Sequence, residues 1–162
     1  MPKKSPKAIV TGGAGFIGSH IVDRLVREGF RVAVIDNLKA GKRENLNPKA
    51  KFYKVDVKNL ADVVRVFKKE KPQYVFHCAA QIDLRFSVKN PWLDAKENII
   101  GGINVIEASR QVNVKRIIFS STGGAIYGGA KQIPTPETMR PHPLSPYGVS
   151  KFSLEEYFHC FR

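Results

Sequence analysis

Short apolar runs alternate along the chain with longer stretches in which apolar residues recur every three or four positions. The short runs are rich in β-branched residues, as expected for strands, and the longer stretches have helical periodicity. Expected strands cover 8–10, 31–35, 52–55, 74–77 and 116–120, and expected helices cover 16–28, 60–69, 91–110 and 147–162. This alternation predicts an α/β fold with a parallel sheet and crossover helices.

Three segments refine this picture. The runs 32–35 and 117–119 are apolar throughout, which predicts strands covered on both faces. The segment 121–146 is rich in glycine and proline and is expected to form one long irregular loop, a kind of loop that is usually functional. The chain of 162 residues is long enough for one compact domain, so we expect a single domain over 1–162.

Composition narrows the class of protein. Lys and Arg number 27 against 14 Asp and Glu, a net charge of +13, but the basic residues are scattered without a dense run. This favours anionic small molecules as partners over nucleic acid. No stretch approaches the ~20 apolar residues of a membrane span, and no secretory signal is recognisable, so a cytoplasmic protein without a membrane partner is expected. Cys78 and Cys160 lack metal-ligand spacing, so no metal site is expected.

A glycine pattern follows the first expected strand, formed by Gly12, Gly15 and Gly18, with Phe16 and Ile17 between the last two. The first glycine permits a tight turn, the second a close approach to a pyrophosphate, and the third close packing of helix on sheet. Amides at the helix start can then meet the phosphate charge. The pattern predicts a Rossmann-type doubly wound sheet that binds a dinucleotide.

Acidic residues end the next two expected strands. Asp36 lies eighteen residues beyond Gly18, where a carboxylate can bind both ribose hydroxyls and repel a 2′-phosphate, so the expected cofactor is NAD. Asp56 and Val57 stand where the adenine is bordered in such folds. The spacing equally allows Asp56 to cap the helix that begins near Leu60, and both interpretations stay open.

A second pattern, Tyr147-x-x-x-Lys151, stands at the start of the last expected helix. A spacing of four residues puts both side chains on one helical face. The ordinary pKa of tyrosine is near ~10, and a nearby ammonium together with the positive nicotinamide ring would favour its phenolate. Tyr147 is therefore a candidate general base. Three hydroxyl residues, Ser120, Ser121 and Thr122, stand where a strand ends, at the edge where open α/β sheets bind ligands.

Together these segments resemble the extended short-chain dehydrogenase/reductases, and within them the NAD-dependent epimerase/dehydratase family typified by UDP-glucose 4-epimerase. The resemblance covers nearly the whole chain from Lys7. The segments that carry it are 11–20, 36–38, 56–57, 77–81, 87–91, 98–101, 120–122, 126–128 and 145–151.

The resemblance implies roles for individual residues. Tyr147 would act as base and acid, Lys151 would hold the nicotinamide ribose and lower the tyrosine pKa, and Thr122 would bind the sugar hydroxyl. Because the segment after Thr122 is one residue longer than the commonest family form, Ser121 is the alternative hydroxyl. The residues implied in cofactor binding are Gly12, Gly15, Phe16, Ile17, Gly18, Asp36, Asn37, Asp56, Val57, Ala79, Ala80, Gln81, Asn98, Ser120, Tyr147 and Lys151. For Asn98 and the two alanines, plain packing is the alternative.

The activity that the resemblance implies is that of an NAD-dependent nucleotide-sugar 4-epimerase, which converts a UDP-hexose through a 4-keto intermediate. Related dehydratases carry an Asp-Glu pair after the catalytic threonine, where this chain has Gly123-Gly124, so an epimerase is favoured and a related reductase or dehydratase is the alternative. Ile82 stands where 4-epimerases often have a lysine that contacts the cofactor.

The resemblance also bears on assembly and completeness. Family members form homodimers, so a homodimer is expected here. They are roughly twice as long, a second half adding further strands and a substrate domain. We therefore expect this chain to be truncated before those parts and to be inactive alone, and an isolated domain that binds NAD without turnover is the second hypothesis.

Overall fold

The computed structural model describes residues 5–130 and 132–161. The chain forms two compact units. Unit 1 consists of the residues up to Ala80 together with Asn104–Ser120, and unit 2 consists of Gln81–Ile103 and the residues from Ser121 onward. The expectation of a single NAD-binding domain over 1–162 stays a prediction.

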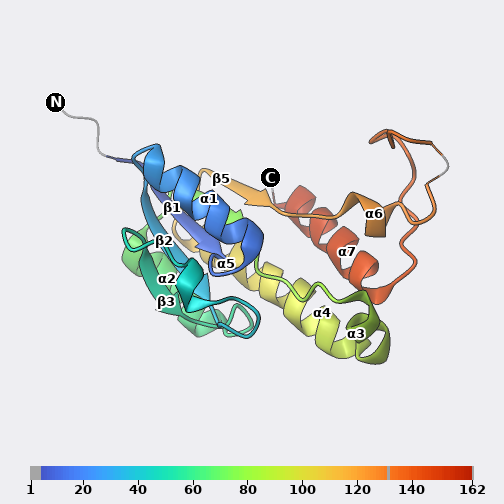
Figure 1. The fold of residues 1–162 in the computed structure, drawn as a ribbon, viewed down its shortest axis with the longest axis horizontal. Coiled ribbons are helices and arrows are strands. Elements are labelled where there is room, and N and C mark those ends of the chain that lie inside the picture. Colours follow the sequence, from blue (N-terminus) through green and yellow to red (C-terminus); the bar gives the residue numbers. More distant parts are fainter. Residues whose placement is uncertain (1–4, 131, 162) are drawn as a thin grey trace. The chain divides into compact units, whose positions relative to one another are not determined.

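Unit 1 is built on a five-stranded parallel sheet with the order β3-β2-β1-β4-β5 (Figure 1). The strands are β1 (Lys7–Thr11), β2 (Arg31–Asp36), β3 (Lys51–Lys54), β4 (Tyr74–His77) and β5 (Arg116–Phe119). The helices are α1 (Phe16–Arg27), α2 (Leu60–Glu70), the short turn η1 (Arg43–Asn45) and most of α5 (Gly101–Gln111). Parallel neighbours need crossover connections, and this strand order is that of a doubly wound sheet. The predicted Rossmann-type fold is confirmed.

Helices cover both faces of the sheet, because successive residues of a strand point to opposite sides. Ile9 of β1 packs with residues of α2 and α5, and Val10 packs with residues of α1. In β2, Ile35 packs on the side of α2 and α5, and Val34 packs on the side of α1. Both faces of β2 are therefore covered, which explains why 32–35 is apolar throughout. The same expectation for 117–119 is wrong. Ile118 is 40% exposed, so the described residues do not fully cover the face of β5 on which it lies.

The turn between β1 and α1 depends on two of its glycines. Gly12 has φ +70°, a left-handed conformation, and its amide donates to the carbonyl of Ile35 at 2.8 Å. A β-carbon at Gly18 would lie 2.1 Å from the carbonyl oxygen of Gly12, closer than any real contact. Only glycine at position 18 therefore lets α1 approach the end of β1 this closely.

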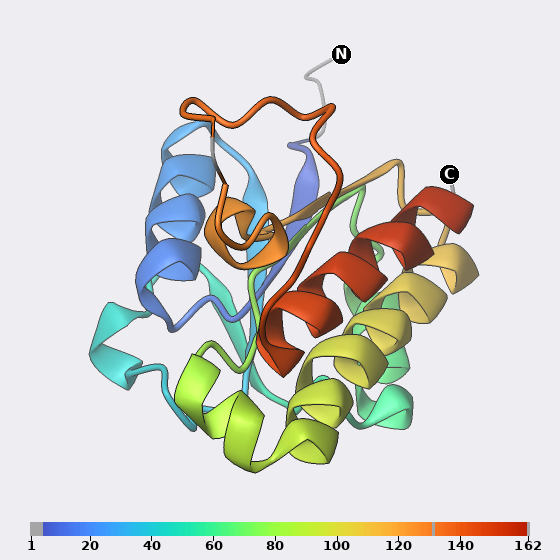
Figure 2. The same ribbon diagram turned by 90° about the vertical axis from the view of Figure 1, so that its right-hand side faces the viewer.

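Unit 2 is helical. Its elements are α3 (Leu84–Lys89), α4 (Pro91–Ala95), the π-helical turn η2 (Lys96–Ile100), the start of α5, α6 (Gly123–Ile126) and α7 (Pro146–Cys160). Because α4, η2 and α5 follow one another without a break, the helix expected over 91–110 is confirmed, with one wider turn inside it. Helix α7 runs beside α4 and η2 (Figure 2).

Local signals fix the start of α7 and its packing. The Ser145 hydroxyl oxygen accepts the Gly148 N–H at 3.1 Å, and Pro146 occupies the first helical position, where its missing N–H costs nothing. A β-carbon at Gly102 would lie 2.3 Å from the Leu154 side chain, so a glycine lets α7 and the start of α5 pack closely.

Two short helices of unit 2 were not expected from the sequence. The carboxylate of Asp83 caps α3 by accepting the N–H of Phe86 at 3.0 Å. Helix α6 interrupts the segment 121–146, which was expected to be irregular throughout. Both helices are too short to show a helical period.

Gly18→Ala is expected to destabilise the protein by about 1–3 kcal/mol, because its methyl group must displace the Gly12 carbonyl or move α1. Gly124→Ala is the matched control, since a β-carbon there meets no other described atom within 4 Å. Replacing glycine with alanine raises helix propensity by about 1 kcal/mol in both variants, so this effect cancels in the comparison. Urea denaturation followed by circular dichroism measures the difference. Equal stability of the two variants would contradict the close approach of α1 to β1.

Candidate functional site

The glycine-rich turn of unit 1 exposes the start of α1. Gly15 stands at the N-cap position and has no side chain to cap the helix. Phe16 and Ile17, the first two helical residues, are 79% and 56% exposed. The uncapped amides of a helix start carry partial positive charge. This end of α1 can therefore accept an anionic group such as a phosphate.

The carboxylate of Asp36, at the end of β2, is held against this turn. It accepts the N–H of Ala14 at 3.0 Å and the N–H of Leu38 at 2.8 Å, and the residue is 8% exposed. The carbonyl of Ala14 in turn accepts the Lys42 N–H and the Asn45 side-chain amide. A carboxylate has about four lone-pair sites, so Asp36 retains capacity to accept ribose hydroxyls.

Basic side chains that follow Asp36 have partners of their own. Lys42 pairs with Glu44 at 3.4 Å, and the Arg43 guanidinium lies over the Phe52 ring at 5.7 Å from its centroid. Both cations are thereby engaged by neighbouring side chains. This arrangement makes Lys42 and Arg43 less available to bind the 2′-phosphate of NADP beside Asp36.

A hydrogen bond joins Asn37, which follows β2, to Asp56, which follows β3. The Asn37 side-chain amide donates to Asp56 at 3.1 Å, and the backbone N–H of Lys58 donates to the same carboxylate at 3.0 Å. Burial raises the pKa of Asp56, but these hydrogen bonds and the Lys58 ammonium outweigh it, and the pKa is lowered. The residue that caps α2 is Asn59, so the interpretation of Asp56 as a helix cap is wrong. Val57 is buried, and its carbonyl accepts the Asn104 side-chain amide at 2.9 Å.

The ends of β4 and β5 bring two further expected residues to the same edge of the sheet. The Ala79 N–H donates to the Thr11 hydroxyl, which also shares a 2.6 Å hydrogen bond with Nδ1 of His77. The Ser120 N–H donates to the His77 carbonyl at 3.1 Å. Because the carboxyl ends of parallel strands meet at one edge, unit 1 gathers Gly12, Asp36, Asp56, Ala79, Ala80 and Ser120 there.

Unit 2 holds the Tyr-x-x-x-Lys pair in its interior. Tyr147 is 8% exposed and Lys151 is 3% exposed. A hydrogen bond joins the Thr122 side chain to the Tyr147 phenol, whereas Ser121 is exposed. This geometry favours Thr122 over Ser121 as the hydroxyl that works with the tyrosine.

The pKa of Tyr147 differs from the sequence-based expectation. Burial raises it, the carboxylate of Asp94 raises it further, and the hydrogen bond with Thr122 lowers it, with a net rise above the ordinary value. In the chain by itself the phenol is therefore protonated at neutral pH. The lowering expected from Lys151 and a bound nicotinamide ring stays a prediction.

Asp94 is a residue that the sequence analysis missed. It is fully buried and accepts hydrogen bonds from Gln81, Asn98 and Ser150, two of which were expected to act at the cofactor. Asn98 also exchanges two hydrogen bonds with the backbone of Gln81, at 2.8 and 3.0 Å. The available signal was the spacing of four between Asp94 and Asn98, which places both on one helical face.

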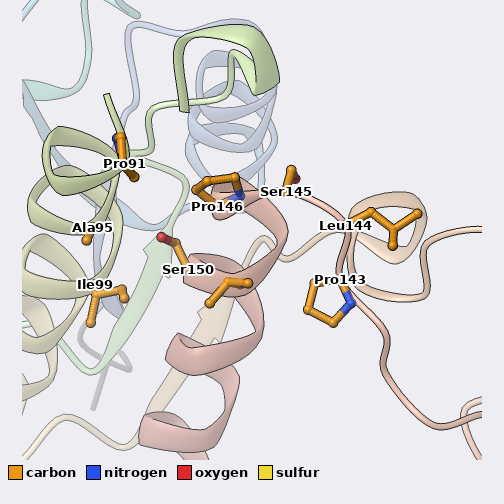
Figure 3. Close-up of a pocket in the computed structure, with 9 residues that line it drawn as sticks. Pro91, Ala95, Ile99, Pro143, Leu144, Ser145, Pro146 and Ser150 are labelled. Carbon is orange, nitrogen blue, oxygen red and sulfur yellow. The ribbon is translucent and has the colours of Figure 1, made fainter. Parts of the chain in front are cut away.

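A groove of about 540 Å³ lies between α4 with η2 on one side and the start of α7 with the segment before it on the other (Figure 3). Its lining consists mainly of apolar side chains: Pro91, Ala95, Ile99, Pro143, Leu144, Ser145, Pro146, Val149 and Ser150. Leu144 and Val149 are 68% and 48% exposed. The groove therefore offers an apolar surface to solvent.

The described residues contain neither a grouping of metal ligands nor a membrane-spanning helix. Among residues 5–130 and 132–161, no three His, Cys, Asp or Glu side chains are grouped so that they could hold a metal ion. None of the helices in this part of the chain has the length and apolar character needed to cross a membrane.

Comparison with known proteins places these features in a family. Residues 8–162 match the NAD dependent epimerase/dehydratase family. The UDP-glucose 4-epimerase of Mycolicibacterium smegmatis is 39% identical over 161 residues, an alignment that covers 96% of this chain and 51% of that protein.

Solved structures that are similar to this chain belong to UDP-glucose 4-epimerases as well. UDP-glucose 4-epimerase from Thermotoga maritima, determined with UDP-glucose, is 52% identical with a TM-score of 0.94, over 96% of this chain and 50% of that one. The Thermus thermophilus UDP-glucose 4-epimerase, determined with NAD, is 46% identical with a TM-score of 0.93, over the same shares of the two chains. The chain thus spans about half the length of these relatives. It belongs to the NAD-dependent epimerase/dehydratase family.

Proposed function

We propose that the chain is the NAD-binding half of a nucleotide-sugar 4-epimerase that acts on a UDP-hexose. The observation that carries this proposal is the buried Tyr147 phenol, hydrogen-bonded to Thr122 and one helical turn from buried Lys151. The similarity to 4-epimerases determined with UDP-glucose and with NAD supports the substrate class and the cofactor. Cys78 and Cys160 are not joined in a disulfide in the part of the chain that the structure describes, and a cytoplasmic location is part of the proposal.

Features of unit 1 fit NAD. The backbone around Gly12 and Gly18 leaves no space for a β-carbon, and the exposed start of α1 offers amides to a pyrophosphate. Asp36 would bind the adenosine ribose, and Asn37, Asp56 and Val57 would border the adenine. When bound, NAD supplies hydride transfer at the sugar C4.

Side chains of unit 2 would transfer the proton of the sugar 4-hydroxyl. Tyr147 would take the proton of the sugar 4-hydroxyl and return it later, and Thr122 would orient that hydroxyl. Lys151 would hold the nicotinamide ribose, and its ammonium would favour the phenolate of Tyr147. Gly123 and Gly124, directly after Thr122, offer no carboxylate for elimination, which supports epimerisation over dehydration.

NAD is expected to bind more tightly than NADP, because the Asp36 carboxylate repels a 2′-phosphate while Lys42 and Arg43 have other partners. Asp36→Ala should narrow the difference by about 1–3 kcal/mol, typical of a charged hydrogen bond. Calorimetry with both cofactors measures it. Glu28→Ala is the control, since Glu28 lies at the far end of α1 and pairs with Arg24. Equal affinity for the two cofactors in the wild type would refute the assignment.

In the longer enzyme, Tyr147→Phe is expected to lower turnover by ~10²-fold or more with little change in NAD affinity, because only proton transfer is lost. Thr122→Ala should lower turnover as well, whereas Ser121→Ala should not, since Thr122 contacts the phenol and Ser121 is exposed. Steady-state epimerisation assays of the three variants test the proton-transfer assignment. Full turnover by Tyr147→Phe would point to a different base, and loss of turnover in Ser121→Ala alone would reverse the choice of hydroxyl.

A homodimer is part of the proposal, with a second copy covering the groove of unit 2. Leu144 and Val149, which line this groove, are apolar and exposed, and so are Trp92, Ile100 and Tyr157 on the helices of the same unit. Exposed apolar surface of this kind favours association. Light scattering at several concentrations should therefore give a dimer. Val149→Glu should shift it toward monomer, and Lys68→Glu, on the exposed face of α2, should not. A wild-type monomer at all concentrations would refute the proposal.

A further inference from the structure

Asp94, on α4, is the most deeply buried carboxylate near the Tyr147 turn, with no solvent-exposed surface. Its Oδ1 accepts the side-chain amides of Gln81 at 2.9 Å and Asn98 at 3.1 Å, and its Oδ2 accepts the Ser150 hydroxyl at 2.5 Å. A buried charge is tolerated only when it is well supplied with hydrogen bonds. Three donors meet that requirement here.

The three donors come from three different parts of unit 2. Gln81 lies in the segment before α3, Asn98 lies in the π-helical turn η2, and Ser150 lies on α7. On α7, Ser150 stands three residues after Tyr147 and directly before Lys151. A hydrogen bond to Ser150 therefore constrains the rotation and the axial position of the helical turn that carries both residues.

The bonds between Gln81 and Asn98 add to this constraint. The Gln81 N–H donates to the Asn98 side chain, and the Asn98 side chain donates to the Gln81 carbonyl. Because the side-chain amides of both residues also donate to Asp94, the three residues form a closed network. Losing the carboxylate would remove one acceptor from each of the two amides, half-buried Gln81 and buried Asn98, and the acceptor of the buried Ser150 hydroxyl, which is costly for buried donors.

We propose that Asp94 is a positioning residue, which holds Gln81, Asn98 and the Tyr147–Lys151 turn of α7 in one arrangement and places a negative charge near the Tyr147 phenol. The proposal rests on the proposed function of Tyr147 as the base. Asp94 acts through the residues that it orients and not by contact with the sugar.

The charge of Asp94 has a consequence for the phenol. A negative charge disfavours the phenolate, so Asp94 raises the pKa of Tyr147, after burial, which is the larger cause. Lys151, also buried, lies one turn along α7. The other charged groups on the elements packed against α7 are exposed or half-buried: Arg85, Lys89, Lys96 and Glu97. Removing the charge of Asp94 while keeping its shape should therefore make Tyr147 easier to ionise.

The test is an NMR titration of the 162-residue chain labelled with ¹³C at the tyrosine ζ-carbon. The Tyr147 signal is the one that disappears in Tyr147→Phe. In Asp94→Asn, which keeps an oxygen acceptor but removes the charge, the Tyr147 midpoint should fall by about one pH unit. In Glu156→Gln, which removes an exposed charge from the same helix, the midpoint should stay where it is in the wild type, because exposed charges are screened.

An unchanged midpoint in folded Asp94→Asn would overturn the proposal, whether or not the chain binds NAD. The reverse outcome, a lowered midpoint without NAD binding, would refute the proposed function and leave the role of Asp94 standing. If Asp94→Asn does not fold, the wild type provides a second measurement. The side-chain amide hydrogens of Gln81 and Asn98 should then exchange at least tenfold more slowly in the wild type than in Ser150→Ala, and equal rates would count against the network.

Discussion

The first turn of α1 lies against the backbone of Gly12, at a separation that excludes any side chain at Gly18. This approach determines where the end of β1, the glycine-rich turn and the helix amides stand with respect to one another. It also brings the N–H of Ala14 to the carboxylate at the end of β2. The proposed contact of the helix amides with the pyrophosphate depends on this steric fit, because it uses backbone that the fit holds in place.

Unit 2 combines close packing at glycine with buried ionisable groups. A buried carboxylate, a buried ammonium and a buried phenol occur within a few helical turns, at Asp94, Lys151 and Tyr147. In an interior of low dielectric these groups influence one another more strongly than they would in water. The protonation of the phenol is thus a property of the set and not of the tyrosine alone. Burial and Asp94 oppose the phenolate, and the hydrogen bond with Thr122 favours it.

Sequence reasoning was strongest where a residue type has one physical purpose. The glycine spacing predicted the turn after β1, and apolar runs predicted strands covered on both faces, correctly for β2. The same rule failed for β5, because a run of apolar residues does not reveal how far other elements cover each face of a strand. The role of Asn59 as the cap of α2 was missed since Asp56 has equally suitable chemistry three residues earlier.

The network around Asp94 was beyond sequence reasoning for a different reason. An aspartate on a helix is usually solvated, and only the packing of α7 on α4 reveals that this one is buried. Likewise, the raised pKa of Tyr147 depends on burial and on a carboxylate 53 positions away along the chain. The spacing of four between Asp94 and Asn98 places both on one helical face, but it reveals neither the burial of Asp94 nor its contact with α7.

The bond between Asp36 and Ala14 links two tasks that dinucleotide-binding proteins are often described as performing separately. The same carboxylate that would recognise the ribose also fastens the backbone that would meet the phosphates. If both act as proposed, recognition of the two parts of the cofactor would be energetically coupled. A substitution at position 36 that changes nucleotide preference would therefore also alter the glycine-rich turn. Its effect on cofactor affinity would not be additive with the effect of a substitution in that turn.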